Sequence, residues 1–210
     1  MDPALPSSLR ILCFGASITA GFHHFGLSHH PYAIRLEERL KQSLPSSTSI
    51  VIEIDGLSGD SVIDGEYFDR LEPRCKSEEY DWIIVQGGGN DFSFGRTPQA
   101  IYEELQKIWR TARGKGWKVL ALTVTETSDR SKAGRARYST LNELVKQHKE
   151  DGFYVADVER AIPWPAEEQE QRRIWDDGLH FKKVGYDMMG DAIAQRLLDI
   201  TRGNVPTAKI

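Results

Sequence analysis

Five short runs of apolar and β-branched residues recur along the 210-residue chain, and helical patterns separate them. The runs span residues 9–14, 50–54, 82–86, 118–124 and 153–157. They are almost continuously apolar, which is typical of strands that are covered on both faces. Alternation of such strands with helices predicts a mostly parallel, doubly wound sheet with helices on both sides.

Four helical patterns lie between and after these runs. The clearest one starts after Thr97, has Pro98 at its first position and ends near Gly114. The other three have apolar faces that begin at Tyr32, Tyr138 and Val184. We therefore expect a three-layer α/β/α sandwich around a five-stranded parallel sheet in the flavodoxin-like order 2-1-3-4-5.

Length and composition indicate one domain. A chain of 210 residues is long enough for one well-buried α/β core and short for two, and it has no internal repeat or linker. We expect a single domain over residues 1–210, with flexible termini at 1–8 and 202–210. The formal net charge of −4 gives no reason to expect nucleic acid or an anionic membrane as a partner.

The start of the chain has no basic segment followed by a long apolar one, so we expect no secretory signal and a cytoplasmic location. No apolar stretch approaches the roughly 20 residues that span a bilayer. The two cysteines, Cys13 and Cys75, make a poor disulfide framework. Cys13 lies inside the first apolar run and is expected to be a buried thiol.

Polar residues and glycines follow several predicted strands. Ser17 comes after the first strand, Gly59 after the second, Asn90 after the third, and Asp177 and His180 come just before the last helix. In open parallel sheets, ligands bind outside the carboxyl ends of the strands. We therefore expect these segments to converge at one edge of the sheet.

The residue types at this edge suit nucleophilic catalysis. Asp177 precedes His180 by three residues, so its carboxylate is placed to orient the imidazole. A histidine held in this way can remove the proton of a serine hydroxyl such as that of Ser17.

Together the four segments resemble the SGNH (GDSL-type) hydrolase family. In this chain, residues 14–19 resemble the family's nucleophile segment and residues 56–60 its glycine segment. Residues 88–91 resemble its asparagine segment, and residues 177–180 its acid–histidine segment. One position differs, because the family usually carries an aspartate immediately before the nucleophile and this chain has Ala16. That carboxylate is not part of the acid–base relay.

The resemblance implies a serine esterase without cofactor or metal, acting on small-molecule carboxylic esters of small or medium acyl groups. Its catalytic residues would be Ser17, Asp177 and His180. The backbone N–H groups of Ser17 and Gly59, with the side-chain amide of Asn90, would form the oxyanion hole. Phe92 and Trp175, with the neighbouring Phe94 and Trp164, are candidates for lining an acyl or alcohol pocket.

Other interpretations remain open for single features. Ser17 could simply be the N-cap residue of a helix, without a catalytic role. The triple glycine at 87–89 could cradle a phosphate, although it lacks the usual lysine. The aromatic side chains could simply pack in the core. His23, His24, His29 and His30 suggest zinc, but without familiar ligand spacing a loop bordering the pocket is favoured.

Two other functions are compatible with the same segments. The first is acyl transfer to an alcohol or sugar through the same acyl-enzyme. The second is a non-catalytic binding module that retains the fold, and Ala16 is the one feature that favours it.

Overall fold

A five-stranded parallel sheet forms the centre of the computed structural model, which describes residues 7–203. Its strands run in the order β4-β1-β5-β6-β7. They span β1 Ser8–Gly15, β4 Ser49–Gly56, β5 Trp82–Val85, β6 Lys118–Leu122 and β7 Phe153–Ala156. All five predicted strands and the flavodoxin-like order are confirmed. The predicted flexible termini, 1–8 and 202–210, lie mostly outside the described residues.

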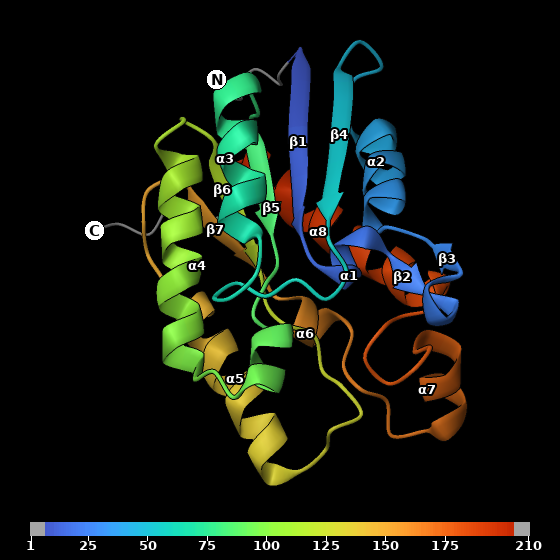
Figure 1. Cartoon of the computed structure of the whole chain (residues 1–210). Coiled ribbons are helices and arrows are strands. Elements are labelled where there is room, and N and C mark those ends of the chain that lie inside the picture. The colour runs from blue at the N-terminus through green and yellow to red at the C-terminus, as the bar shows by residue number, and fades with distance from the viewer. Residues whose placement is uncertain (1–6, 204–210) are drawn as a thin grey trace.

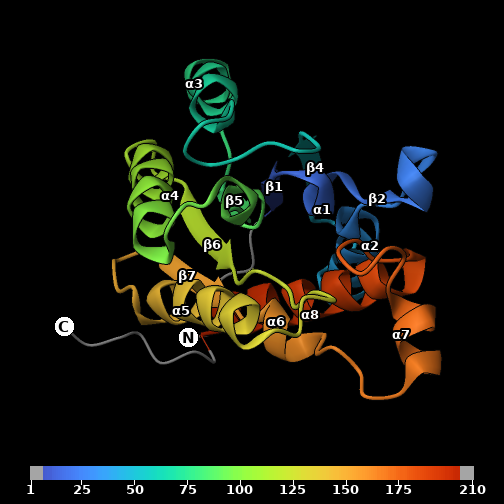
Figure 2. The ribbon, with the colours of Figure 1, turned by 60° about the horizontal axis from the view of Figure 1, so that its bottom comes forward.

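Helices cover both faces of this sheet (Figures 1 and 2). Successive residues of β1 point to opposite faces, as in any strand. Ile11 and Cys13 pack in one apolar cluster with α2 and α8, whereas Leu12 and Phe14 pack in the other with α3, α4 and α5. These helices span α2 Tyr32–Ser43, α3 Tyr67–Ser77, α4 Pro98–Arg113, α5 Lys132–Gln147 and α8 Lys183–Thr201. The predicted three-layer α/β/α sandwich is therefore confirmed.

The edge strand β4 differs from the buried strands that the sequence suggests. Val51 is 41% exposed, and Glu53 and Asp55 both form ion pairs with Arg74 of α3. An edge strand has only one neighbouring strand to help cover it, so polar side chains on it can reach solvent and partners. These ion pairs thus join α3 to the edge strand β4.

Several short elements gather at the carboxyl ends of the strands (Figure 1). They include the one-turn helix α1, a two-stranded hairpin and the 3₁₀ turn η2. Their spans are α1 Ser17–Ala20, β2 Phe22–His23, η1 His24–Gly26, β3 Ser28–His29, η2 Asn90–Phe94, α6 Val158–Ala161 and α7 Glu168–Ile174. No helix among residues 7–203 is both long enough and apolar enough to cross a membrane.

Candidate active site

Ser17 is the first residue of α1 and is separated from the end of β1 by Ala16 alone. The turn between them is tight, because a Cβ atom on Gly15 would come within 2.2 Å of Thr19 Oγ1 and 2.8 Å of the Gln86 carbonyl oxygen. Glycine is therefore required for this close approach. The side chain of Ser17 does not cap the helix; Ala16 is the N-cap residue, without a side-chain hydrogen bond. The capping interpretation of Ser17 is wrong.

His180 and Asp177 complete a hydrogen-bonded row with Ser17. The Nε2 atom of His180 lies 2.9 Å from Ser17 Oγ, and its Nδ1 atom lies 2.7 Å from Asp177 Oδ2. A carboxylate only accepts hydrogen bonds, so Nδ1 carries the proton and Nε2 is left to accept from the serine hydroxyl. The predicted serine, histidine and aspartate are thus brought together across 163 residues of chain.

The Asp177 carboxylate is held by its own turn. Its Oδ1 atom accepts the backbone N–H groups of Leu179 at 2.9 Å and His180 at 2.7 Å. Partial burial raises the pKa of Asp177, but these N–H groups and the imidazole outweigh that effect and leave the pKa below its ordinary value. Asp177 is therefore ionised at neutral pH and fixes the imidazole. The N-cap of α8 is Lys182, so Asp177 does not cap that helix.

The three predicted oxyanion donors lie on the turns that follow β1, β4 and β5. Asn90 begins η2, and one of its amide hydrogens is bound to the Asp60 carbonyl oxygen at 2.7 Å, which leaves the other for a ligand. Gly59 has a φ of +85°, and no atom lies within 4 Å of the position its Cβ would take. Within residues 7–203, no hydrogen bond takes up the backbone N–H of Ser17 or Gly59. Each of the three groups thus keeps an N–H that is free of hydrogen bonds within the described residues, and their role as an oxyanion hole stays a prediction.

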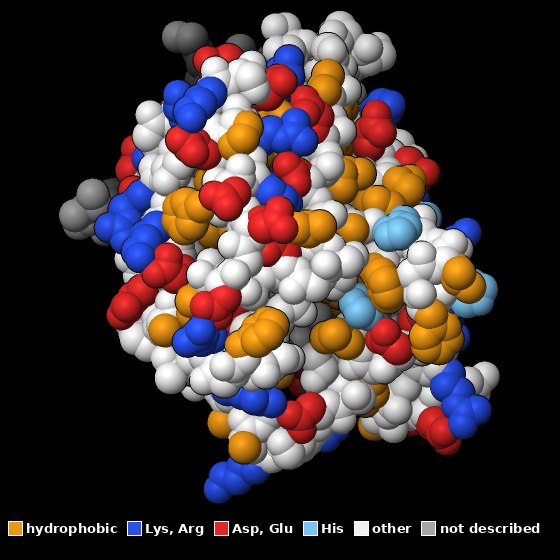
Figure 3. All heavy atoms as spheres, viewed as in Figure 1, with side chains coloured by type: hydrophobic (Ala, Val, Ile, Leu, Met, Phe, Trp, Pro, Cys, Tyr) orange, Lys and Arg blue, Asp and Glu red, His pale blue; other side chains and the backbone are white. Residues whose placement is uncertain are grey.

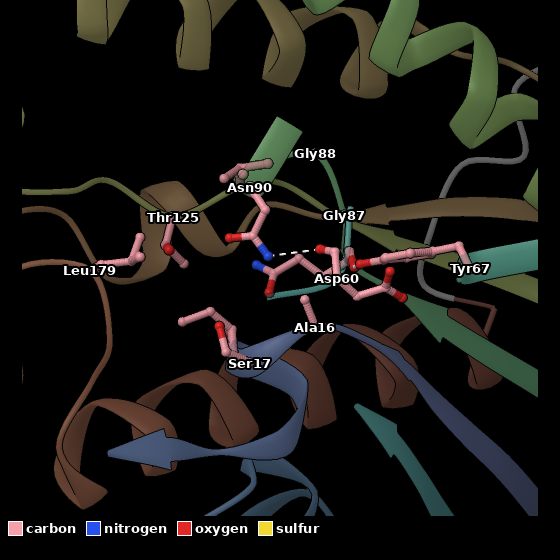
Figure 4. Close-up of a pocket in the computed structure, with 13 residues that line it drawn as sticks. Ala16, Ser17, Asp60, Tyr67, Gly87, Gly88, Asn90, Thr125 and Leu179 are labelled. Atoms are coloured by element: carbon pink, nitrogen blue, oxygen red, sulfur yellow. Dashed lines mark hydrogen bonds between the residues drawn. The ribbon is translucent and has the colours of Figure 1, made fainter. Parts of the chain in front are cut away.

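A small cavity adjoins these groups (Figure 4). It encloses about 40 Å³ and is lined by both Ser17 and Asn90. Gln86, Val124, Thr125 and Leu179 also line it, and none of them was predicted. Their positions after β5, after β6 and beside His180 are the signal that could have identified them, because the carboxyl ends of these strands share one edge.

The structure places Phe92 and Trp175, the predicted pocket aromatics, in the core. Neither side chain lines the cavity, and both are buried. Phe92 packs against Tyr138 with ring centroids 4.8 Å apart, and Trp175 packs against Phe181 at 4.3 Å. These rings lie in the core because full burial of an aromatic side chain stabilises the fold more than partial exposure at the edge of a cavity does. These contacts favour the alternative that both rings pack in the core.

The histidines of the predicted loop have separate partners. His23 Nδ1 lies 2.9 Å from the Ser28 carbonyl oxygen, and His30 Nε2 lies 2.8 Å from Asp187. In the described part of the chain, no three His, Cys, Asp or Glu side chains are grouped so that they could hold a metal ion.

A parallel α/β sheet with a serine–histidine–aspartate row at its edge is the arrangement of a serine hydrolase. The chain belongs to the GDSL-like lipase/acylhydrolase family, whose sequence model matches residues 13–188. The match includes all of the site segments. The resemblance noted in the sequence is therefore confirmed.

Relatives agree with this assignment. The chain is 21% identical over 203 residues to an arylesterase of Vibrio mimicus, covering 94% of this chain and 92% of the relative. It is 25% identical over 189 residues to thioesterase 1/protease 1/lysophospholipase L1 of Escherichia coli K12, covering 89% of this chain and 82% of the relative. The protein is a carboxylic ester hydrolase.

Solved structures share the fold. A G-D-S-L family lipolytic protein of Veillonella parvula superposes with a TM-score of 0.71 at 22% identity, covering 89% of this chain and 97% of that one. An acetylxylan esterase of Geobacillus stearothermophilus gives a TM-score of 0.71 at 16% identity, covering 90% and 94%.

Proposed function

We propose that this enzyme hydrolyses carboxylic esters of small or medium acyl groups through a covalent acyl-enzyme on Ser17. The observation that carries the proposal is the continuous row from the Ser17 hydroxyl through both nitrogens of His180 to the Asp177 carboxylate, with contacts of 2.9 and 2.7 Å. A serine hydroxyl is a weak nucleophile until a base of this kind removes its proton.

In the first half of the reaction, Ser17 Oγ attacks the ester carbonyl carbon while His180 Nε2 takes the hydroxyl proton. The negative charge that develops on the carbonyl oxygen is stabilised by the N–H groups of Ser17 and Gly59 and by the Asn90 amide. The intermediate collapses when the bond to the leaving oxygen breaks and His180 returns its proton to that alcohol. The acyl group remains on Ser17.

In the second half, water attacks the acyl-enzyme and gives its proton to His180. The bond between the acyl carbon and Ser17 Oγ then breaks, the carboxylic acid leaves and Ser17 regains its proton. The Asp177 carboxylate keeps the imidazole in the required tautomer and stabilises the imidazolium in both halves.

The size of the cavity supports short acyl chains. It encloses about 40 Å³, whereas a single water needs roughly 10–15 Å³ in the same measure. Only a few atoms of an acyl group fit in the enclosed part. The rest of the ester would extend over the open surface, where Figure 3 shows hydrophobic side chains around a hollow. Leu57, Phe94 and Leu179, from three loops of the site, are 37%, 63% and 37% exposed.

The test is turnover of a panel of p-nitrophenyl esters, from acetate to octanoate, by the wild type and by Ser17→Ala and His180→Ala. Both substitutions should lower kcat by at least about 10⁴-fold, since removing one member of the relay disables the whole unit. Far-ultraviolet circular dichroism should show an unchanged fold. Wild-type rates in Ser17→Ala would end the proposal, and a preference for octanoate would overturn the inference of short acyl chains from the size of the cavity.

A further inference from the structure

We propose that Arg70, a residue of α3 outside the catalytic row, positions the three donors of the oxyanion hole relative to one another. This inference rests on the proposed function and adds a residue to it. Arg70 does not line the cavity, so it acts through its neighbours and not on the substrate.

The Arg70 side chain uses all five of its N–H groups. Nη2 donates to the Gly15 carbonyl oxygen at 2.9 Å and to Asp60 Oδ2 at 2.7 Å, and Nε donates to the same Asp60 oxygen at 3.2 Å. Nη1 donates to the Asp55 carbonyl oxygen at 3.0 Å and also to the Asp55 carboxylate. A guanidinium has five N–H donors in one plane, so this pattern fixes its orientation completely.

These acceptors belong to the segments that carry the oxyanion donors. Gly15 ends β1 two residues before Ser17, and Asp60 follows Gly59 directly. The third donor is connected through the same residue, because the Asp60 carbonyl oxygen holds the Asn90 amide at 2.7 Å. Arg70 is thus hydrogen-bonded to the nucleophile turn and the glycine turn, and one residue links it to the asparagine turn.

The surroundings keep this group rigid. The Arg70 side chain is 13% exposed and the Asp60 side chain 1% exposed. The guanidinium lies over the ring of Phe14 at 4.6 Å from its centroid and over that of Tyr67 at 5.2 Å. Solvent screens buried charges far less than exposed ones, so these contacts hold the backbone carbonyls at fixed positions. An oxyanion hole requires donors placed before the reaction begins.

Lysine cannot reproduce this arrangement. Its ammonium is a single point with three donors, and it cannot reach the Gly15 and Asp55 carbonyl oxygens and the Asp60 carboxylate in one plane. Arg70→Lys retains the positive charge but loses the hydrogen bonds to at least one of the two turns, the nucleophile turn at Gly15 or the glycine turn at Asp60. The donors then lie away from the developing oxyanion, and displacement of about 1 Å can lower a rate about 10²-fold.

Arg74 offers a matched control one turn further along α3. It pairs with Asp55 at 3.1 Å and with Glu53 at 2.9 Å, but it reaches neither Gly15 nor Asp60. On a p-nitrophenyl acetate assay, Arg70→Lys should lower kcat about 10- to 100-fold with KM changed less than about threefold. Arg74→Lys should leave both constants within about twofold.

A second measurement separates positioning from stability. A boronic acid that adds to Ser17 forms a tetrahedral adduct resembling the intermediate, so phenylboronic acid reports on the donors directly. Its inhibition constant should rise in Arg70→Lys by a factor similar to the loss in kcat, while the melting curve still shows one folded state. Asp60→Asn, which removes the charge that Arg70 binds, should give the same pattern.

Equal kcat values for Arg70→Lys and Arg74→Lys would overturn the positioning role, as would an unchanged inhibition constant or failure of both Arg70→Lys and Asp60→Asn to fold. The proposed function is tested separately, by comparing ester turnover of the wild type with that of Ser17→Ala, and this comparison does not involve Arg70. The two proposals can therefore fail separately.

Discussion

At the scale of single residues, the site depends on one carboxylate in the correct turn. Asp177 binds two backbone N–H groups with one oxygen and the His180 imidazole with the other. The two sets of contacts require a short segment between Asp177 and His180. With more residues between them, one carboxylate could not bind both the backbone N–H groups of the turn and the imidazole.

Asp177→Asn should lower kcat about 10³- to 10⁴-fold on p-nitrophenyl acetate. An amide placed beside Nδ1 can donate a hydrogen bond, which favours the wrong imidazole tautomer and leaves Nε2 unable to accept the Ser17 proton. Initial-rate kinetics at saturating ester measures the effect.

The neighbouring carboxylate is the control for this substitution. Asp176 accepts the backbone N–H of His24 at 2.5 Å and does not bind the imidazole. Asp176→Asn should therefore retain kcat within about threefold. Similar losses in the two variants would assign the effect to the loop rather than to the tautomer.

At the scale of elements, the loops that carry the donors are joined by buried polar side chains. Asp91 follows Asn90, is fully buried, and accepts the backbone N–H groups of Val62 and Ile63, each at 2.9 Å. Burial raises the pKa of Asp91, and the two N–H groups partly oppose that rise. Asp91 thus links the asparagine turn to the segment after Gly59.

Asp91→Asn should lower the free energy of unfolding by about 1–3 kcal/mol, because an amide has one oxygen where the carboxylate had two and one buried N–H loses its acceptor. Urea denaturation followed by circular dichroism measures the change. Asp64→Asn is a suitable control, since Asp64 pairs with Arg96 at the surface, with both side chains 44% exposed. If the two variants were equally stable, the buried carboxylate would have no linking role.

The sequence was sufficient to predict the elements with strong periodicity. All five strands and the helices α2, α4, α5 and α8 were predicted, and α4 has the expected Thr97 cap. The helix α3, which carries Arg70, was missed. Pro73 lies inside it and charged residues surround its few apolar positions, although Tyr67, Leu71 and Cys75 recur at four-residue spacing on its buried face.

The catalytic residues could be predicted because their chemistry is tied to particular residue types in a particular order. The role of Arg70 could not be predicted, because it depends on hydrogen bonds to backbone carbonyl oxygens, which no sequence pattern reveals. Phe92 and Trp175 were assigned to the pocket on proximity in sequence alone, whereas packing with Tyr138 and Phe181 determines where they lie.

At the scale of the whole molecule, strand order brings the two ends of the chain to one site. β1 lies between β4 and β5, so the turns after these three strands lie side by side at one edge. α8 packs beside α2 on one face of the sheet, and His180 precedes α8 by three residues. The nucleophile and its base therefore meet only in the folded chain.

We propose that the contact between His180 and Ser17 activates the serine hydroxyl. The most direct measurement is the reaction of the intact enzyme with a fluorophosphonate, followed by peptide mass spectrometry, in the wild type and in His180→Ala. We predict one phosphonyl adduct per chain, located on Ser17, which forms at least about 100-fold more slowly without the imidazole. An adduct on another residue, or equal labelling rates in the two proteins, would contradict the account.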